Sequence, residues 1–157
     1  MTEYVPQLAT ILSNRYPEED DNRLLLFGVR RVAAGGLNDA HAANAYLAAF
    51  GLGYRRPLIL LRALMAELSR VSNRRILIAP CCCPRTTAAE ASILDAVISA
   101  VEAPHQAHRL LCDTLGVENC LGALSSAQAL GQAFADLGHP LAARASPSPS
   151  VPALPID

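Results

Sequence analysis

Apolar residues recur every three or four positions along most of this chain, which is the spacing of amphipathic α-helices. Short polar or glycine-containing links separate the periodic segments. The predicted helices cover approximately residues 6–15, 20–35, 38–50, 57–70, 87–102, 104–115 and 125–137. The pattern therefore predicts an all-α fold, an irregular bundle of about six or seven helices with short connections.

Two helix starts are marked by capping boxes, in which a Ser or Thr is followed three positions later by Glu or Gln. Thr87 with Glu90 predicts the start of the fifth helix, and Ser125 with Gln128 predicts the start of the seventh.

The second predicted helix has an apolar side and a basic side. Leu25, Leu26 and Val29 belong to its predicted buried side. Arg23 and Arg30 stand seven positions apart, and we expect both to face solvent.

Residues 74–79, RRILIA, form the one strand-like run in the chain. A lone strand has no partner for its backbone hydrogen bonds, so the run is either one short strand or an extended, buried connector. The next six residues, PCCCPR, contain too much proline for a helix.

The composition changes after His139. The chain ends in SPSPSVPALPID, which alternates Ser with Pro and lacks helical periodicity. Such a segment buries too little apolar surface to fold. We therefore expect a single helical domain over residues 1–139 and a disordered tail over residues 140–157.

Hydrophobic residues make up 52% of the 157 positions and charged residues 17%, which is enough apolar surface for one core. The formal net charge of −1 argues against binding to nucleic acid or to an anionic membrane. The most apolar run, residues 58–68, contains Arg62 and Glu67 and is shorter than the ~20 residues of a membrane span. The N-terminus does not resemble a signal peptide, so we expect a cytoplasmic protein. The partners considered are a second copy of the chain and another protein.

Three of the five cysteines, Cys81, Cys82 and Cys83, are consecutive. Such a set does not suit a secreted disulfide framework and indicates free thiols or metal ligands in a reducing compartment. In an extended loop Cys81 and Cys83 share one side, and Arg85 and the following helix N-terminus favour a thiolate. Cys81, Cys82, Cys83 and Arg85 are therefore a candidate binding site. The alternative is that the thiols fill a tight turn between two prolines.

The sixth predicted helix carries a second candidate cluster. His105, His108 and Cys112 occupy positions i, i+3 and i+7, which share one helix face. Joined to the consecutive cysteines, they suggest a tetrahedral zinc site whose predicted ligands are Cys81, Cys83, His108 and Cys112. Neither half has a C-x-x-C spacing, and the alternative is that both histidines are ordinary boundary or surface residues.

The stretches RLLLFGVRRVAAGGLNDAHAAN, RRPLILLRALMAELSR and APCCCPRTTAAE resemble those of a small family of uncharacterised bacterial proteins. The resemblance covers roughly residues 23–138. The family is a domain of unknown function, so the resemblance implies no catalytic residue. It implies only that the three consecutive cysteines are the family's hallmark.

Two classes of function remain open. The first is a thiol or zinc-type site at Cys81 and Cys83 that serves in binding or sensing. The second is a helical protein-interaction module with no metal and no catalysis. An enzyme is less favoured, because the sequence does not offer a nucleophile, a base and an orienting group together.

Overall fold

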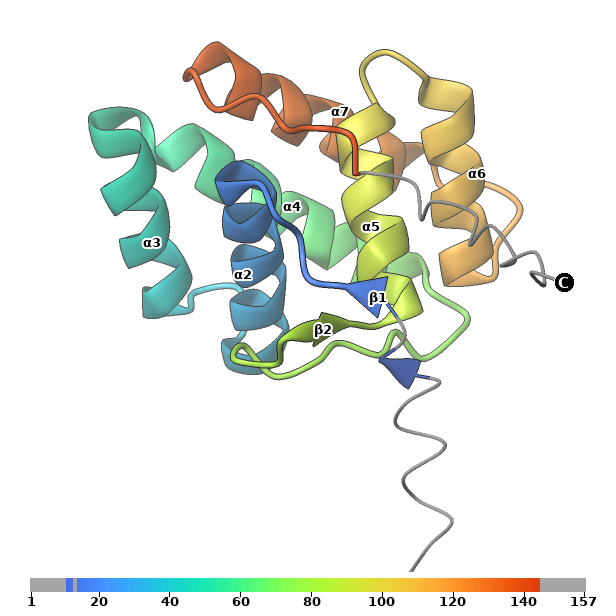
Figure 1. Ribbon diagram of the computed structural model, residues 1–157. Coiled ribbons are helices and arrows are strands. Elements are labelled where there is room, and N and C mark those ends of the chain that lie inside the picture. The colour runs from blue at the N-terminus through green and yellow to red at the C-terminus, as the bar shows by residue number, and fades with distance from the viewer. Residues whose placement is uncertain (1–10, 13, 145–157) are drawn as a thin grey trace, which may run out of the picture.

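The computed structural model describes residues 11–12 and 14–144 (Figure 1). Its helices are α2 (Asp20–Gly35), α3 (Ala40–Phe50), α4 (Arg55–Val71), α5 (Ala88–Ser99), α6 (Pro104–Leu115) and α7 (Leu121–Asp136). A 3-10 turn, η1 (Gly51–Gly53), joins α3 to α4. The two-residue strands β1 (Asn14–Arg15) and β2 (Arg85–Thr86) pair antiparallel. The predicted all-α fold is confirmed. The first predicted helix lies mostly outside the described residues, and its last two positions form β1.

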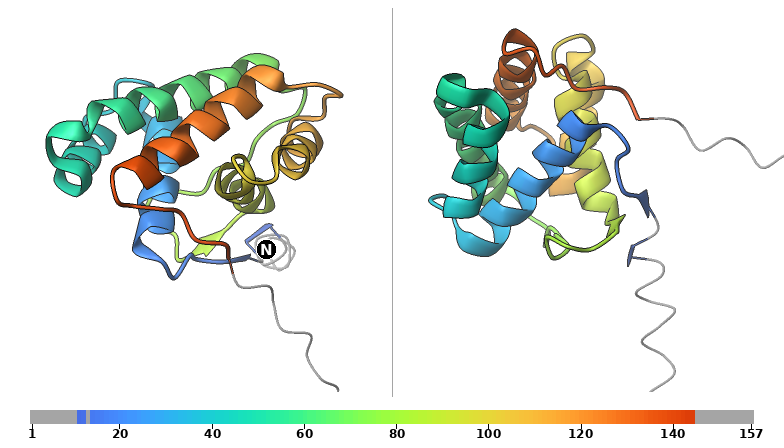
Figure 2. Two further views of the ribbon diagram at one scale, coloured as in Figure 1. Left: turned by 90° about the horizontal axis from the view of Figure 1, so that it is seen from above. Right: turned by 60° about the vertical axis from the view of Figure 1, so that its left-hand side comes forward.

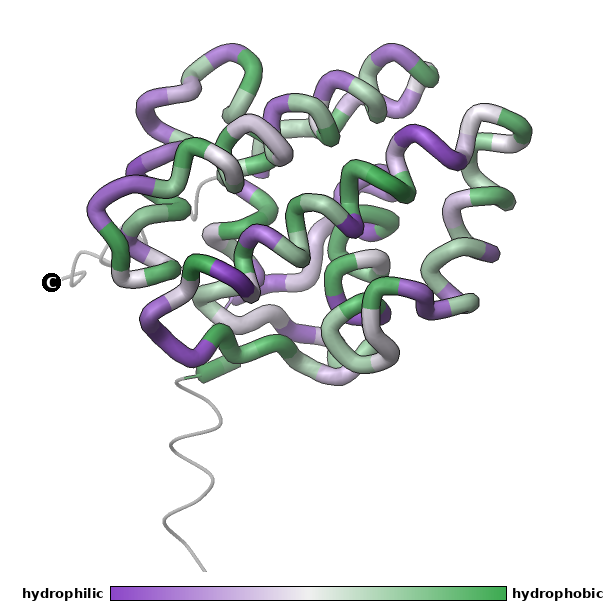
Figure 3. Tube along the Cα trace, turned by 180° about the vertical axis from the view of Figure 1, so that it is seen from behind, coloured by the Kyte–Doolittle hydropathy of each residue, from purple (hydrophilic) through white to green (hydrophobic). Residues whose placement is uncertain are grey.

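The helices pack in pairs around one core. The most extensive contacts join α4 to α7 and α5 to α6. Figure 2 shows α4 and α7 side by side, and Figure 3 shows apolar and polar positions alternating along the helices. Every described α-helix contributes at least one fully buried side chain, among them Leu25, Tyr46, Leu61, Leu94, Leu111 and Phe134.

The strand-like run 74–79 is an extended connector between α4 and β2 and forms no strand. Ile76 and Ile78 pack against the core. The carbonyl oxygen of Leu77 accepts a 2.7 Å hydrogen bond from the Thr87 hydroxyl, which ties the connector to the start of α5. Of the two sequence-based alternatives, the extended connector is confirmed, but it is buried only in part, since Leu77 is 46% exposed.

The prediction that Arg30 faces solvent is wrong. Its side chain is 1% exposed, and its Nε lies 2.6 Å from Oε2 of Glu90, which is 0% exposed. Arg30 also donates to the carbonyl oxygens of Cys83 (2.9 Å) and Arg85 (2.8 Å), so α5 and the loop before it cover this part of α2. Arg23 is exposed, as predicted. Glu90 forms the predicted capping box with Thr87 as well, so that prediction is confirmed.

The prediction that Ser125 starts the last helix is also wrong. The helix α7 begins four residues earlier, at Leu121, and Ser125 lies exposed within it. Ala123 and Ala127 are both buried, so the apolar spacing extends back past the serine. The N-cap residue, Cys120, makes no side-chain capping bond. The N–H of Leu121 instead donates to Oδ1 of Asn119 at 3.2 Å, so packing against the core and a cap from Asn119 mark the start of α7.

The first five residues of the predicted tail are described and lie against α2 and α5. The side-chain amide of Asn22 donates to the carbonyl of Ala142 at 2.8 Å and accepts from the backbone N–H of Ala142 at 3.2 Å. Arg144 donates to both carboxylate oxygens of Asp95 at 2.6 Å. The rest of the predicted tail lies outside the described residues.

Candidate metal centre

Three potential metal ligands meet where α6 ends and α7 begins: His108, Cys112 and Cys120. Their ligand atoms all lie within 4.8 Å of one another. Within residues 11–12 and 14–144, this is the one group of three or more His, Cys, Asp or Glu side chains with that geometry. Cys120 is buried, and the other two side chains are half-buried. We refer to these three residues as the His-Cys-Cys cluster.

A short turn between two helices brings the cluster together. Pro104 occupies the first turn of α6, and Gly116, with φ 67°, ends the helix in the left-handed conformation that favours glycine. The N–H of Val117 then donates to the carbonyl of Cys112 at 3.1 Å, which turns the chain back beneath the last turn of α6. Three residues later Cys120 is the N-cap of α7. Because α6 and α7 pack on each other and on α5, the core holds both sides of the cluster.

The donor atoms of the cluster are already in contact. The Cys112 sulfur lies 3.4 Å from the Cys120 sulfur and 3.5 Å from Nε2 of His108. The backbone N–H of Cys120 donates to the same Nε2 at 3.2 Å. Nε2 is therefore an acceptor, which places the proton of a neutral imidazole on Nδ1.

Burial raises the pKa of the Cys120 thiol to about 12, and its hydrogen bond and proximity to the Cys112 sulfur add to the effect. Cys120 is therefore a neutral thiol near pH 7 in the metal-free protein. A metal ion binding to this sulfur has to displace its proton.

The three consecutive cysteines occupy a separate surface turn. The N–H of Cys83 donates to the carbonyl of Pro80 at 3.1 Å, so Cys81 and Cys82 are the two central residues of a β-turn. Both are exposed, and Cys83 is half-buried. The hydrogen bond from buried Arg30 to the Cys83 carbonyl fixes the turn against α2. We refer to residues 80–83 as the cysteine turn.

Arg31, which the sequence analysis did not single out, lies beside the cysteine turn. Its guanidinium donates to both carboxylate oxygens of Asp39 (3.3 and 2.8 Å). The hydrogen bonds to Asp39 and, less strongly, the proximity of the Cys81 sulfur raise the pKa of Arg31. Arg85, the predicted cation of this site, donates from its Nε to the carbonyl of Leu12 at 2.8 Å.

The structure thus brings together only part of the predicted ligand set. His108 and Cys112 lie in the His-Cys-Cys cluster, whereas Cys81 and Cys83 lie in the cysteine turn and are not part of that cluster. Cys120 was not among the ligands predicted from the sequence. The signal that could have identified it is the helix-stop glycine four positions earlier, because a residue just past such a stop returns to the last turn of the helix that it leaves.

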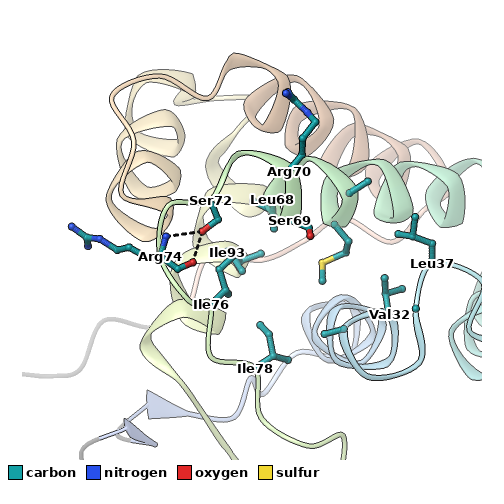
Figure 4. A pocket seen from close by; sticks show the side chains of 14 residues that line it. Val32, Leu37, Leu68, Ser69, Arg70, Ser72, Arg74, Ile76, Ile78 and Ile93 are labelled. Atoms are coloured by element: carbon teal, nitrogen blue, oxygen red, sulfur yellow. Dashed lines mark hydrogen bonds between the residues drawn. The ribbon is translucent and has the colours of Figure 1, made fainter.

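A groove of about 670 Å³ runs between α2, α4 and the connector (Figure 4). Figure 4 shows the guanidinium groups of Arg70 and Arg74 pointing away from it. Arg70 pairs with Glu67 at 2.9 Å, and Arg74 donates to the carbonyl of Asp113 at 3.1 Å. The walls are mainly aliphatic and include Val32, Leu37, Met65, Leu68, Ile76, Ile78 and Ile93.

None of the described helices combines the length and the apolar run that crossing a membrane requires. No curated protein matches the chain, and no solved structure matches it. The resemblance to an uncharacterised family is confirmed, although the match does not test whether the consecutive cysteines are its hallmark. A family model matches residues 7–139, and the chain belongs to that family, the family of unknown function DUF6628.

Proposed function

We propose that the protein binds one zinc ion at the His-Cys-Cys cluster and that this site serves to bind or to sense zinc. The observation that carries the proposal is the convergence of one imidazole and two thiols within 4.8 Å at the junction of two packed helices. Imidazole and thiolate are the ligands that Zn²⁺ favours in proteins.

Two of the three distances between the donor atoms are close to those around one tetrahedral ion. With Zn–S near 2.3 Å and Zn–N near 2.0–2.1 Å, two ligands of the same ion lie about 3.5–3.8 Å apart. The separations of the Cys112 sulfur from Nε2 of His108 and from the Cys120 sulfur are 3.5 and 3.4 Å. Small side-chain movements therefore suffice to bind the ion.

Three protein ligands leave a fourth position for water or an external ligand, which is typical of exchangeable and catalytic zinc and not of closed structural sites. Two thiolates and a neutral imidazole also balance the charge of Zn²⁺, so a bound ion adds no net charge to a partly buried site. A cytoplasmic location, which belongs to this proposal, would keep both thiols reduced between binding events.

Zinc binding has two costs. Coordination by Nε2 of His108 replaces the 3.2 Å hydrogen bond from the N–H of Cys120. The Cys120 proton must also leave, so the affinity for zinc falls as the pH falls. Both costs favour an exchangeable ion over a permanent structural one, which supports a role in binding or sensing.

The test uses untagged protein that is reduced, stripped with a chelator and titrated with Zn²⁺ or Co²⁺. One equivalent should bind, and cobalt should give the absorption of a tetrahedral site with thiolate ligands. Cys120→Ser and His108→Gln should each lower the affinity by more than the ~10–100-fold that loss of an outer-shell partner costs. Elemental analysis gives the stoichiometry.

The matched controls are His105→Gln, an exposed histidine on the same helix, and Cys82→Ser, an exposed thiol of the cysteine turn. Both should bind zinc as the wild type does. Failure to bind one equivalent, or unchanged binding by Cys120→Ser, would overturn the proposal. Weakened binding in Cys81→Ser or Cys83→Ser alone would instead favour a site at the cysteine turn.

A second candidate function, a helical interaction module, is favoured by the groove. Leu37 at the groove is 44% exposed and Met65 is half-buried, and exposed apolar surface often marks a site of protein interaction. Self-association is the direct test. Light scattering should show a dimer, and the substitution Met65→Glu at the groove should dissociate it. A wild-type protein that is monomeric at every concentration would count against this function.

A further inference from the structure

The sulfur atoms of Cys112 and Cys120 lie 3.4 Å apart. The sulfur–sulfur bond of a disulfide is about 2.05 Å long, so the two atoms need to approach by only about 1.4 Å. Neither cysteine is bonded to another cysteine in this structure. The two thiols are therefore reduced and adjacent.

The two thiols differ in their access to solvent. Cys112 is half-buried, whereas Cys120 is 4% exposed. A small oxidant therefore reaches Cys112 first. The Cys120 sulfur, shielded from the oxidant but in contact with Cys112, is placed to react with the oxidised Cys112 before a second oxidant molecule does.

Both cysteines lie at helix ends, where a small movement is inexpensive. Cys112 is in the last turn of α6, and Cys120 is the uncapped N-cap of α7. The chain between them is short, so a disulfide here restrains the unfolded chain less than a bond closing a long loop. Such a disulfide stays within reach of reduction by cellular thiols.

We propose that Cys112 and Cys120 are a reversible dithiol–disulfide pair, oxidised by hydrogen peroxide or another hydroperoxide. The Cys112 sulfur attacks a peroxide oxygen, the O–O bond breaks, and a sulfenic acid and one water form. The Cys120 sulfur then attacks the Cys112 sulfur, the S–O bond breaks, and the departing hydroxyl takes the proton of the Cys120 thiol and leaves as a second water. In total two thiols lose two protons and two electrons, and hydrogen peroxide becomes two waters.

Oxidation also acts on the zinc site. The same two sulfurs are ligands there, so a bond between them removes two of the three protein ligands and releases the ion as hydrated Zn²⁺. This release rests on the proposed function, whereas the disulfide does not. Two molecules of a small thiol reverse the step, giving two protein thiols and one small-molecule disulfide.

Trypsin separates the two groups of cysteines, because the chain contains no lysine and cleavage follows arginine alone. Residues 76–85 carry Cys81, Cys82 and Cys83, and residues 110–144 carry Cys112 and Cys120. Zinc-loaded protein is treated with one equivalent of hydrogen peroxide beside a chromophoric zinc indicator, then alkylated and digested. The two peptides report on the cysteine turn and on the proposed pair independently.

We expect the 110–144 peptide to be unalkylated and two hydrogens lighter, with one zinc released for each disulfide. Dithiothreitol should restore both alkylation sites. Cys120→Ser should leave Cys112 as a sulfenic or higher acid with no bond inside this peptide, and Cys82→Ser should behave as the wild type.

The outcomes separate the two proposals. The redox pair is overturned if both cysteines of the 110–144 peptide are still alkylated in a sample whose 76–85 peptide has been oxidised. If that sample also retains its zinc, the proposed metal site is unaffected. A disulfide that forms in protein unable to bind zinc supports the redox pair and overturns the metal site.

Discussion

The guanidinium of Arg30 and the carboxylate of Glu90 form a salt bridge 2.6 Å long inside the core. One partner comes from α2 and the other from the first turn of α5, sixty positions later in the chain. Nη2 also donates to Oε1 of Glu90 at 3.2 Å, and Nη1 and Nη2 donate to the carbonyls of Cys83 and Arg85, so each guanidinium nitrogen makes at least one hydrogen bond. This pair fixes the loop that carries the cysteine turn.

Arg30→Met should destabilise the protein by about 3–5 kcal/mol, because it leaves the Glu90 carboxylate buried without its partner. The free energy of unfolding from urea titration, followed by circular dichroism, measures this loss. Arg56→Met is the matched control, since Arg56 pairs with Asp136 at 2.8 Å on the surface and should contribute at most about 1 kcal/mol. Equal losses in the two variants would show that water reaches the inner pair.

Helical periodicity was enough to predict the fold class and most of the helices, because each helix shows its apolar face in its own sequence. The same periodicity could not place Arg30. Whether a polar face is exposed to solvent depends on which other element packs on it. Here α5 and the loop before it pack on Arg30. A local pattern carries no information about that partner.

The candidate site, like the fold, could be predicted from the sequence only in part. His108 and Cys112 are four positions apart on one helix, so their proximity follows from helix geometry. Cys120 joins them only through the path of the chain around the left-handed glycine between the helices. The separation of the cysteine turn from the cluster depends on the packing of the whole bundle, which spacing alone does not give.

Gly116→Ala should lower the melting temperature, because φ 67° costs an L-residue about 1–2 kcal/mol. A Cβ at this position would also lie 2.7 Å from Nε of Arg74. Gly138→Ala is the control, since this glycine also ends a helix, with φ 82° and open space around its Cβ. Each kcal/mol corresponds to about 2–4 °C for a domain of this size. The loss at Gly116 should be the larger of the two, and equal losses would mean that Arg74 moves aside freely.

The stability should depend on pH through Asp39. Hydrogen bonds from the Arg31 guanidinium and from the N–H of Ala42 lower the pKa of Asp39 to about 2. Its unfolded value is near ~3.9, so the stabilisation is complete above about pH 4 and is lost as the pH falls through the folded value.

The matched variant is Asp39→Asn, because asparagine caps a helix as well as aspartate does but carries no charge. In urea titrations the variant should be less stable than the wild type at pH 7, and the difference should shrink between pH 4 and pH 2. Glu18→Gln, an exposed carboxylate, serves as the control. A difference that does not change with pH would show that Asp39 acts through its cap alone.

A chain that ends at Arg144 should melt as the full chain does, whereas one that ends at His139 should be less stable. The shorter chain loses both hydrogen bonds between Asn22 and Ala142 and the ion pair of Arg144 with Asp95. Asn22 is fully buried, and an unsatisfied buried amide costs about 1–3 kcal/mol. Thermal melts of the two truncated proteins measure the difference. Identical melting temperatures would show that residues 140–144 do not stabilise the domain, which would then end at residue 139 as predicted.

The pairing of Asn22 with Ala142 has a consequence for synthesis on the ribosome. The two residues are 120 positions apart, and at ~5–20 residues per second they are made about 6–24 s apart. During that interval α2 has emerged without the carbonyl and N–H that its buried amide requires. The domain therefore completes this contact only after Ala142 has been translated, and chaperones have that whole interval in which to engage α2.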